Sequence, residues 1–213
     1  MNSQPVKAVF SRNYKSVQAR VKKLPEYTPD LIKAILKRDA LMLNKNFHDG
    51  IKNRSFHLEK LSDSTIKQKR YLGYRYPNIP LYGAGDDQDK NSYINMLRLR
   101  KVKNGYIVRP SISKHWNCDL PLRALYQIHE FGKLITYTSS TGKVVTINIP
   151  RRPALHEAFK KLMRERSNKD RSKILKDTIS NYLKTGNKSY MQEVMKNQYK
   201  DLAKYEAIME GNQ

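Results

Sequence analysis

Residues 28–53, TPDLIKAILKRDALMLNKNFHDGIKN, carry the clearest helical pattern of the chain. Thr28 is a good N-cap, Pro29 suits the first helical position, and Asp30 complements the helix dipole there. Apolar residues recur at helical spacing on one broad face: Leu31, Ile32, Ile35, Leu36, Leu43, Phe47 and Ile51. The pattern predicts an amphipathic helix over 29–52, about 35 Å long, that can lie across a sheet.

Two stretches downstream predict β-hairpins. Met96–Val102 and Tyr106–Pro110 flank a turn with Asn104 and Gly105, and Asn-Gly favours a type I′ turn with positive φ at both residues. The second stretch, 134–150, has β-branched limbs around a polar turn. We expect the two hairpins to form a mainly antiparallel sheet covered by the long helix.

Shorter helical patterns surround these hairpins. One covers 61–70, with Ser62 or Asp63 as its cap, and a second covers 121–130. Three more follow, over 153–165, 170–185 and 188–209. The predicted fold class is therefore α+β: an antiparallel β-sheet of hairpins packed by a long N-terminal helix, with a helical C-terminal extension.

The domain organisation follows from these elements. Residues 1–27 are expected to form an N-terminal arm, which could include a short strand at Val6, Ala8 and Phe10. Residues 28–165 are expected to form the α+β body, and 166–213 the helical extension.

The stretch 71–91, YLGYRYPNIPLYGAGDDQDKN, has neither a helical nor a strand period. A loop of this length inside a compact domain is usually functional or disordered. We expect it to form an inter-subunit arm that becomes ordered against a neighbour. Its tyrosines are candidate anchors, and the candidate contact residues are Tyr74, Tyr76, Tyr82, Asp86 and Asp87.

The chain of 213 residues has 42 Lys and Arg against 19 Asp and Glu, a net charge of +23. The excess is spread evenly, with +8 over 1–54, +8 over 55–150 and +7 over 151–213. Such a chain repels copies of itself until a polyanion or an acidic partner neutralises it. No apolar run approaches the roughly 20 residues of a membrane span, and no signal peptide is recognisable. We expect synthesis in the cytoplasm and no contact with membranes.

Catalytic and metal-binding patterns are weak. His115 and Cys118 could contribute two zinc ligands, but no second pair lies nearby. Cys118 with His115 or His129 lacks a nucleophile signature. Asp86, Asp87 and Asp89 could bind Mg²⁺ for nuclease chemistry, yet they lie in a polar loop without apolar framing. We therefore expect no enzyme activity, no metal and no cofactor.

Basic side chains are the candidate contacts with a partner or with DNA. Arg98, Arg100, Lys101 and Lys103 belong to one face or edge of the first hairpin, where Arg98 and Arg100 alternate with leucines. Arg151 and Arg152 lie on a stiff backbone before Pro153, and guanidinium groups pair bidentately with phosphate or carboxylate. A solvated charged face is the alternative interpretation.

Five short motifs occur in a fixed order over residues 28–165, after the long helix. They are Leu61-Ser62-x-x-Thr65-Ile66-x-x-Lys69, Pro80-Leu81-Tyr82-x-x-Gly85, Tyr93-Ile94-x-Met96-Leu97, Tyr126-x-Ile128-His129-Glu130-Phe131-Gly132 and Ile149-Pro150-Arg151-Arg152-Pro153-Ala154-Leu155. In this order they resemble the minor tail-component and virion-morphogenesis proteins of tailed bacteriophages, also called neck or tail-completion proteins. The chain departs from that pattern at Arg151, where alanine is usual, and at Gly83-Ala84-Gly85-Asp86.

The resemblance implies a non-enzymatic virion protein, a subunit of a ring that is often six-fold. Its implied partners are other copies of itself, the portal or adaptor of the DNA-filled head, tail-terminator or other neck proteins, and packaged DNA. The leading alternative is a sequence-nonspecific nucleic-acid-binding protein, and a nuclease is third. Particle incorporation, salt-dependent DNA binding and metal-dependent cleavage separate the three.

Overall fold

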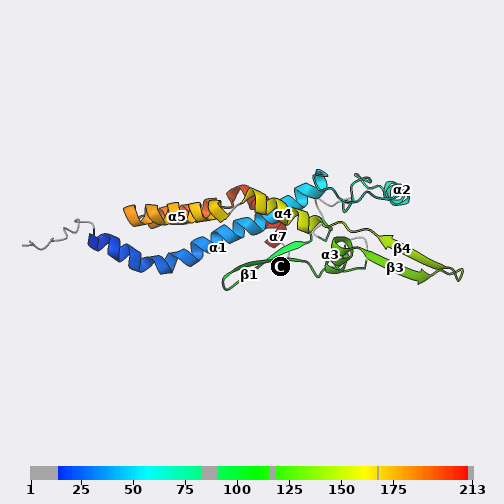
Figure 1. Ribbon diagram of the computed structural model, residues 1–213, viewed down its shortest axis with the longest axis horizontal. Helices are drawn as coiled ribbons and strands as arrows, with labels where there is room; N and C mark the ends of the chain where they lie inside the picture. The colour runs from blue at the N-terminus through cyan, green and yellow to red at the C-terminus, as the bar shows by residue number, and fades with distance from the viewer. Residues whose placement is uncertain (1–13, 83–90, 116–118, 167, 211–213) are drawn as a thin grey trace, which may run out of the picture.

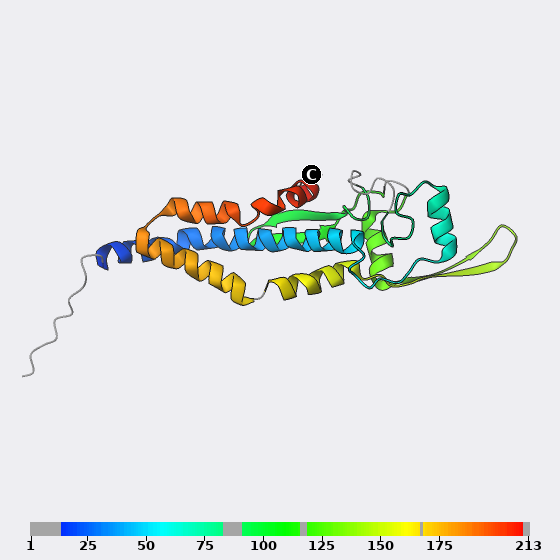
Figure 2. The same ribbon diagram turned by 90° about the horizontal axis from the view of Figure 1, so that it is seen from above.

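The computed structural model describes residues 14–82, 91–115, 119–166 and 168–210. The predicted α+β class is confirmed: helices run the length of the molecule, and two small hairpins accompany them (Figure 1). One long helix runs through most of the molecule, and the first hairpin and the C-terminal helices pack along it (Figure 2). The strand that was expected at Val6, Ala8 and Phe10 lies outside the described residues.

Helix α1 spans Tyr14–Lys52 and begins well before the predicted start at Pro29. Pro25 and Pro29 both lie inside it, and the ribbon bends in this N-terminal part (Figure 1). Prolines inside a helix are a common cause of such bends. Thr28 does not cap a new helix, because its hydroxyl donates to the carbonyl of Leu24 at 2.8 Å. The expected arm 1–27 is thus helical from Tyr14 onward.

The two ends of α1 bury different apolar faces in two separate cores. Towards its C-terminus the fully buried Leu41, Phe47 and Ile51 join the larger core, together with the first hairpin. Towards its N-terminus Leu31 and Ile35 join a smaller core, which the C-terminal helices complete. Helix α1 therefore contacts both the body and the extension.

The first hairpin consists of β1 (Leu97–Val102) and β2 (Gly105–Pro110), paired antiparallel as predicted. Leu97 and Leu99 are buried in the larger core, which places Arg98 and Arg100 on the opposite face. The predicted turn type is wrong. In the part of the chain that the structure describes, positive φ occurs at Arg54, Leu81 and four glycines, and neither Asn104 nor Gly105 is among them.

The φ angle of Gly105 does not require glycine, but the space beside it is restricted. It is buried where β2 meets α1, and a Cβ at this position would lie 3.1 Å from Leu36 Cδ1. The Asn-Gly pair thus predicts the position of the hairpin correctly, but not its turn geometry. The glycine instead lets the backbone of β2 lie close to α1.

The second hairpin consists of β3 (Lys133–Thr138) and β4 (Val144–Ile149). It follows α3 (Leu122–Phe131), which ends at Gly132 with φ +75°. In the described chain the two hairpins form two separate two-stranded sheets, and not the one sheet that we expected. The β3–β4 hairpin projects from one end of the molecule, beside α2 (Asp63–Tyr71) (Figure 2). Both of its strands are largely exposed, and neither is hydrogen-bonded to a strand of the first hairpin.

The helical extension folds back along α1. Helix α4 (Ala154–Glu165) and α5 (Asn168–Thr185) run along one side of it, and α6 (Lys188–Asn197) returns along the other (Figure 2). The helix predicted over 188–209 is broken. A 3₁₀ turn at Lys200–Leu202 precedes α7 (Ala203–Glu210), and the break lets Leu202 and Met209 reach the larger core.

Consecutive charged residues of α1 bind this extension. Lys37 pairs with Glu206 and, at 3.0 Å, with Glu210. Arg38 pairs with Asp201 at 2.9 Å. Burial opposes the charge on Lys37, but the two carboxylates prevail and raise its pKa.

The third of these charges, Asp39, lies 2.6 Å from both Arg166 and Arg171 at the start of the extension. Arg166 is buried, so its positive charge needs the compensating charge of that carboxylate. These pairs fix which turn of α1 each part of the extension meets.

Replacing Gly105 with valine should lower the free energy of unfolding by about 1–3 kcal/mol, because the new side chain collides with Leu36. Chemical denaturation of the purified protein measures the loss. Leu36→Ala in the Gly105→Val background should recover part of the stability, because it vacates the contacted space. A loss unaffected by Leu36→Ala would show that backbone strain, and not this contact, requires glycine.

Candidate functional site

The motif segments of the body meet at a buried junction before α4. Arg152 lies at its centre with 6% of its surface exposed. Its Nε donates to the carbonyl of Glu59 at 3.0 Å, one Nη donates to that of Lys60 at 3.3 Å, and its backbone N–H donates to that of His129 at 2.6 Å. Burial lowers the pKa of the guanidinium. Arg152 therefore joins three segments of one chain, and the expectation that it faces a partner is wrong.

Glu130, the last residue but one of α3, caps the start of α4. Its buried carboxylate accepts the backbone N–H of Leu155 at 3.3 Å and that of His156 at 3.0 Å. Pro153, which precedes α4, supplies no side-chain cap. Burial raises the pKa of Glu130, and these two hydrogen bonds oppose the rise. The carboxylate thus holds the start of α4 against the end of α3.

Arg151 has the opposite environment to Arg152. Its side chain is exposed, and its Nε donates to the carbonyl of Glu130 at 3.0 Å. Gly132 permits this crossing, because a Cβ there would lie 3.2 Å from both Arg151 N and Ile149 O. Of the two arginines, Arg151 alone remains a candidate contact.

His129 is packed inside the junction. Its ring lies 5.3 Å from that of Tyr93 in an edge-to-face arrangement. Burial, and then the charges of Arg152 and His115, lower the pKa of His129 to about 4. The imidazole is therefore uncharged at neutral pH.

The described part of the long loop is bound by α2. Lys69 Nζ donates to the carbonyl of Ile79 at 2.9 Å and to that of Tyr82. Tyr82 is buried in the larger core and its ring lies 5.2 Å from that of Tyr76, whereas Tyr71 is 90% exposed. Tyr82 is therefore packed inside its own chain, where it anchors the loop, and this burial does not fit the predicted contact with a neighbour.

The remaining candidate contact residues of the loop are either partly exposed or outside the described residues. Tyr74 and Tyr76 are partly exposed, and the ring of Tyr74 lies 5.4 Å from Lys69 Nζ. Asp86 and Asp87 lie outside the described residues, as do Asp89 and Cys118.

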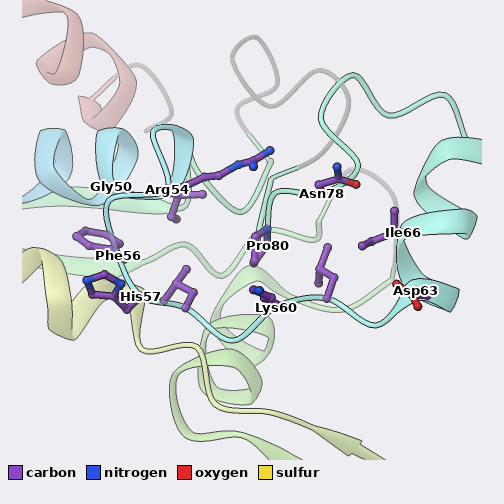
Figure 3. A pocket seen from close by; sticks show the side chains of 12 residues that line it. Gly50, Arg54, Phe56, His57, Lys60, Asp63, Ile66, Asn78 and Pro80 are labelled. Carbon is purple, nitrogen blue, oxygen red and sulfur yellow. The ribbon is translucent and has the colours of Figure 1, made fainter.

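A cavity of about 430 Å³ lies between the end of α1 and α2 (Figure 3). Gly50 allows Phe56 to close its inner side, because a Cβ at Gly50 would overlap the Phe56 ring. Apolar side chains supply half of the lining residues, and Arg54, His57, Lys60 and Asp63 supply the charged and titratable groups. The side chains in Figure 3 come from separate segments and do not converge on one point. The cavity thus offers apolar contact surface, with charged groups spread over separate segments.

Four of the predicted basic contacts lie together on the first hairpin. Arg100, Lys101 and Lys103 are exposed. Arg98 is half-buried and donates to the carbonyls of Asn95 and, at 3.1 Å, Leu97. Burial lowers its pKa.

Sequence reasoning missed a fifth member of this group. Arg109 lies directly opposite Arg98 in the antiparallel register. A cleft of about 450 Å³ is lined by Arg98, Arg100, Lys101 and Arg109. Only the pairing register reveals Arg109, because eleven positions separate it from Arg98 in the sequence.

The described parts of the chain contain neither a cluster of metal-binding side chains nor a helix that could span a membrane. Within residues 14–82, 91–115, 119–166 and 168–210, no three His, Cys, Asp or Glu side chains are grouped so as to hold a metal ion. No helix in these same ranges is long and apolar enough to cross a bilayer.

Charge-reversal variants of Arg151 and Arg152 should differ in stability. Arg152→Glu should cost on the order of 3 kcal/mol, because it leaves a buried carboxylate facing the carbonyls of Glu59 and Lys60. Arg151→Glu, its matched control, should cost less than about 1.5 kcal/mol, because it loses one exposed hydrogen bond. Thermal melts of the two single variants test this, and equal melting temperatures would contradict the buried role of Arg152.

His129 should make stability depend on pH. Its folded pKa of about 4 lies below the ordinary 6.5, so the unfolded chain binds more protons between these values. Stability is then lost as the pH falls, by about 2 kcal/mol between pH 7 and pH 5. Urea unfolding of the wild type and of His129→Asn at both pH values measures the effect. The variant should lose less on acidification, and an equal loss would show that other groups cause it.

Neither protein-family models, curated proteins nor solved structures match this chain. The likeness to phage neck proteins thus rests on the short motifs and their order. The contacts described above are the further ground for proposing a function.

Proposed function

We propose that the chain is a structural subunit of the neck of a tailed bacteriophage, where a ring of copies joins the DNA-filled head to the tail. The observation that carries the proposal is the exposed β3–β4 hairpin. It extends from the body with strands that find little cover within their own chain. A protein built to assemble leaves such a surface for its neighbour.

The register of the hairpin makes one of its faces strongly apolar. That face carries Ile135, Tyr137, Val145, Ile147 and Ile149. Tyr137 and Ile147 are 48% and 45% exposed. The other face is mostly polar, with Thr136 and Thr146 in hydroxyl contact at 3.1 Å.

Exposed apolar patches of this kind mark protein interaction sites. A two-stranded hairpin is marginally stable alone in water, so burial against a neighbouring subunit would stabilise it. The outer edges of β3 and β4 also offer backbone groups that another strand can pair with. Another copy of the chain is the proposed neighbour, because ring assembly repeats one such contact around an axis.

The mutual contacts of the motif segments support the same proposal. Arg152 binds the backbone just before Leu61, Glu130 caps the helix that begins at Ala154, and Lys69 binds the backbone at Tyr82. Residues that resemble a family pattern thus hold one another in place, as parts of one framework would. Their role is to build the body and to present the hairpin.

The other proposed features of this role follow from charge and from the family likeness. The proposed partners are the portal or adaptor, tail-terminator or other neck proteins, and packaged DNA. The proposed site of action is the virion, after synthesis in the host cytoplasm, and the proposed role is non-enzymatic. A sequence-nonspecific nucleic-acid-binding protein is the second candidate, and the arginines of the first hairpin favour it.

Loss of the protein from infected cells should leave filled heads and tails that accumulate separately. Electron microscopy of the lysates is the measurement. Joined, infectious particles in its absence would overturn the neck assignment.

The apolar hairpin face is tested by Tyr137→Thr with Ile147→Thr. Both side chains are about half exposed and threonine favours strands, so the melting temperature should change little. Joining of heads and tails should fall sharply, as scored by complementation and microscopy. The matched control is Leu134→Thr with Val144→Thr on the opposite face, where both residues are also exposed. Equal yields from the two variants would contradict the assignment of the contact to this face.

A further inference from the structure

The outer edge of β4 borders a groove of about 780 Å³. The groove lies between the end of β4 and the segment that starts α2, which contribute Ile147, Asn148, Ile149, Leu61, Ser62 and Thr65. Consecutive residues of a strand point to alternate faces, so a groove lined by all three β4 residues follows the strand's edge. Of the described lining residues none belongs to β3, and among the described strands β4 pairs with β3 alone.

The backbone of β4 can pair with an added strand at this edge. The Ser139 N–H donates to the Lys143 carbonyl at 2.8 Å, and hydrogen-bonded and non-hydrogen-bonded pairs alternate from there along the hairpin. Thr146 is consequently in a non-hydrogen-bonded pair with Thr136, and its N–H and C=O point away from β3. Extended segments bind such edges through main-chain hydrogen bonds, and neighbouring side-chain pockets supply the specificity.

The N-terminal sequence contains a segment with the pattern of such a strand. Val6, Ala8 and Phe10 alternate with Lys7 and Val9, and all five lie outside the described residues. A strand added to β4 in the matching orientation continues the apolar face of the hairpin with its three alternating apolar side chains. The residue before this stretch is a proline, which is tolerated at the start of a strand.

The chain that carries the hairpin cannot supply this strand to itself. Val6 is eight positions before Tyr14, where α1 begins, and eight residues span at most about 29 Å. Helix α1 has 39 residues and is therefore about 58 Å long. The hairpin projects from the end of the molecule opposite to the start of α1 (Figure 2). The donor of the strand is therefore a second copy.

We propose that residues 6–10 of one copy add as a strand to the outer edge of β4 in the next copy. The proposal rests on the proposed ring of copies, and it names the segment that makes the contact. Donor and acceptor lie at opposite ends of the molecule (Figure 2). Their interface is therefore heterologous, the kind that repeats around an axis and closes into a ring.

The test cross-links two full-length copies that are purified separately and carry different tags. Cys118, the only native cysteine, is replaced by serine in both. One copy carries Val9→Cys, and the other carries one cysteine in the hairpin. The β4 positions are Val144→Cys, Thr146→Cys and Asn148→Cys, and the matched controls are their exposed register partners on β3, Thr138→Cys, Thr136→Cys and Leu134→Cys. The copies are mixed and oxidised at about 0.5 M salt, where a Debye length of about 4 Å screens their repulsion.

At least one β4 cysteine should form a disulfide with the arm cysteine, because neighbouring strands are about 4.8 Å apart. The β3 cysteines would lie about 9.6 Å from the added strand, beyond the roughly 7 Å that a disulfide spans, and should form none. Equal cross-linking at β3 and β4, or none at either, overturns the proposal. In virions, a cross-link from β4 to a protein other than this chain would assign the groove to that protein and would also overturn it.

A proline pair tests the backbone hydrogen bonds of the added strand. Of two consecutive N–H groups one faces β4 in any register, and Ala8→Pro with Val9→Pro removes both. The matched control is Ser3→Pro with Gln4→Pro, which lies outside the alternating stretch. The first variant should lose self-association in sedimentation and head–tail joining in complementation, whereas the control should keep both. Unchanged self-association of the first variant would contradict the strand contact.

The strand contact and the neck role fail separately. Joined particles in the absence of the protein refute the neck role, and a β4-specific cross-link between copies then still establishes the strand contact. Separate heads and tails without that cross-link refute the strand contact and leave the neck role in place.

Discussion

Burial of one arginine side chain determines how the body of this protein closes. The buried Arg152 side chain loses its hydration and instead donates hydrogen bonds to the carbonyl oxygens of Glu59 and Lys60. A buried cation without such acceptors would be too costly to keep. The strand β4, the segment before α2 and the end of α3 must therefore meet at one point. The positions of the cavity in Figure 3 and of the projecting hairpin both depend on this meeting.

Much of the secondary structure was predictable, because local signals determine it. Ser62 caps α2, Gly132 ends α3, and the alternation of Leu97 and Leu99 identifies a half-buried strand. The errors arise where distant packing overrides a local signal. Pro29 is typical of a helix start, yet the smaller core keeps the chain helical on both sides of it.

The candidate site was less predictable, for a related reason. Arg151 and Arg152 are identical and adjacent, yet one is exposed and the other is buried. Their difference depends on carbonyl groups some ninety residues away in the sequence, which no local pattern contains. Arg109 was missed because its importance comes from the residue opposite it in the hairpin.

The open strands of the second hairpin have a consequence for the lifetime of the free protein. Short β-rich segments with few charges and unpaired edges readily join one another in an uncontrolled way. The hairpin carries only lysines as charged residues, whereas the whole chain carries +23. Mutual repulsion should therefore delay premature stacking of free copies, and that delay should end when counter-charge arrives. If the chain assembles as proposed, its pervasive positive charge would then help to time that assembly.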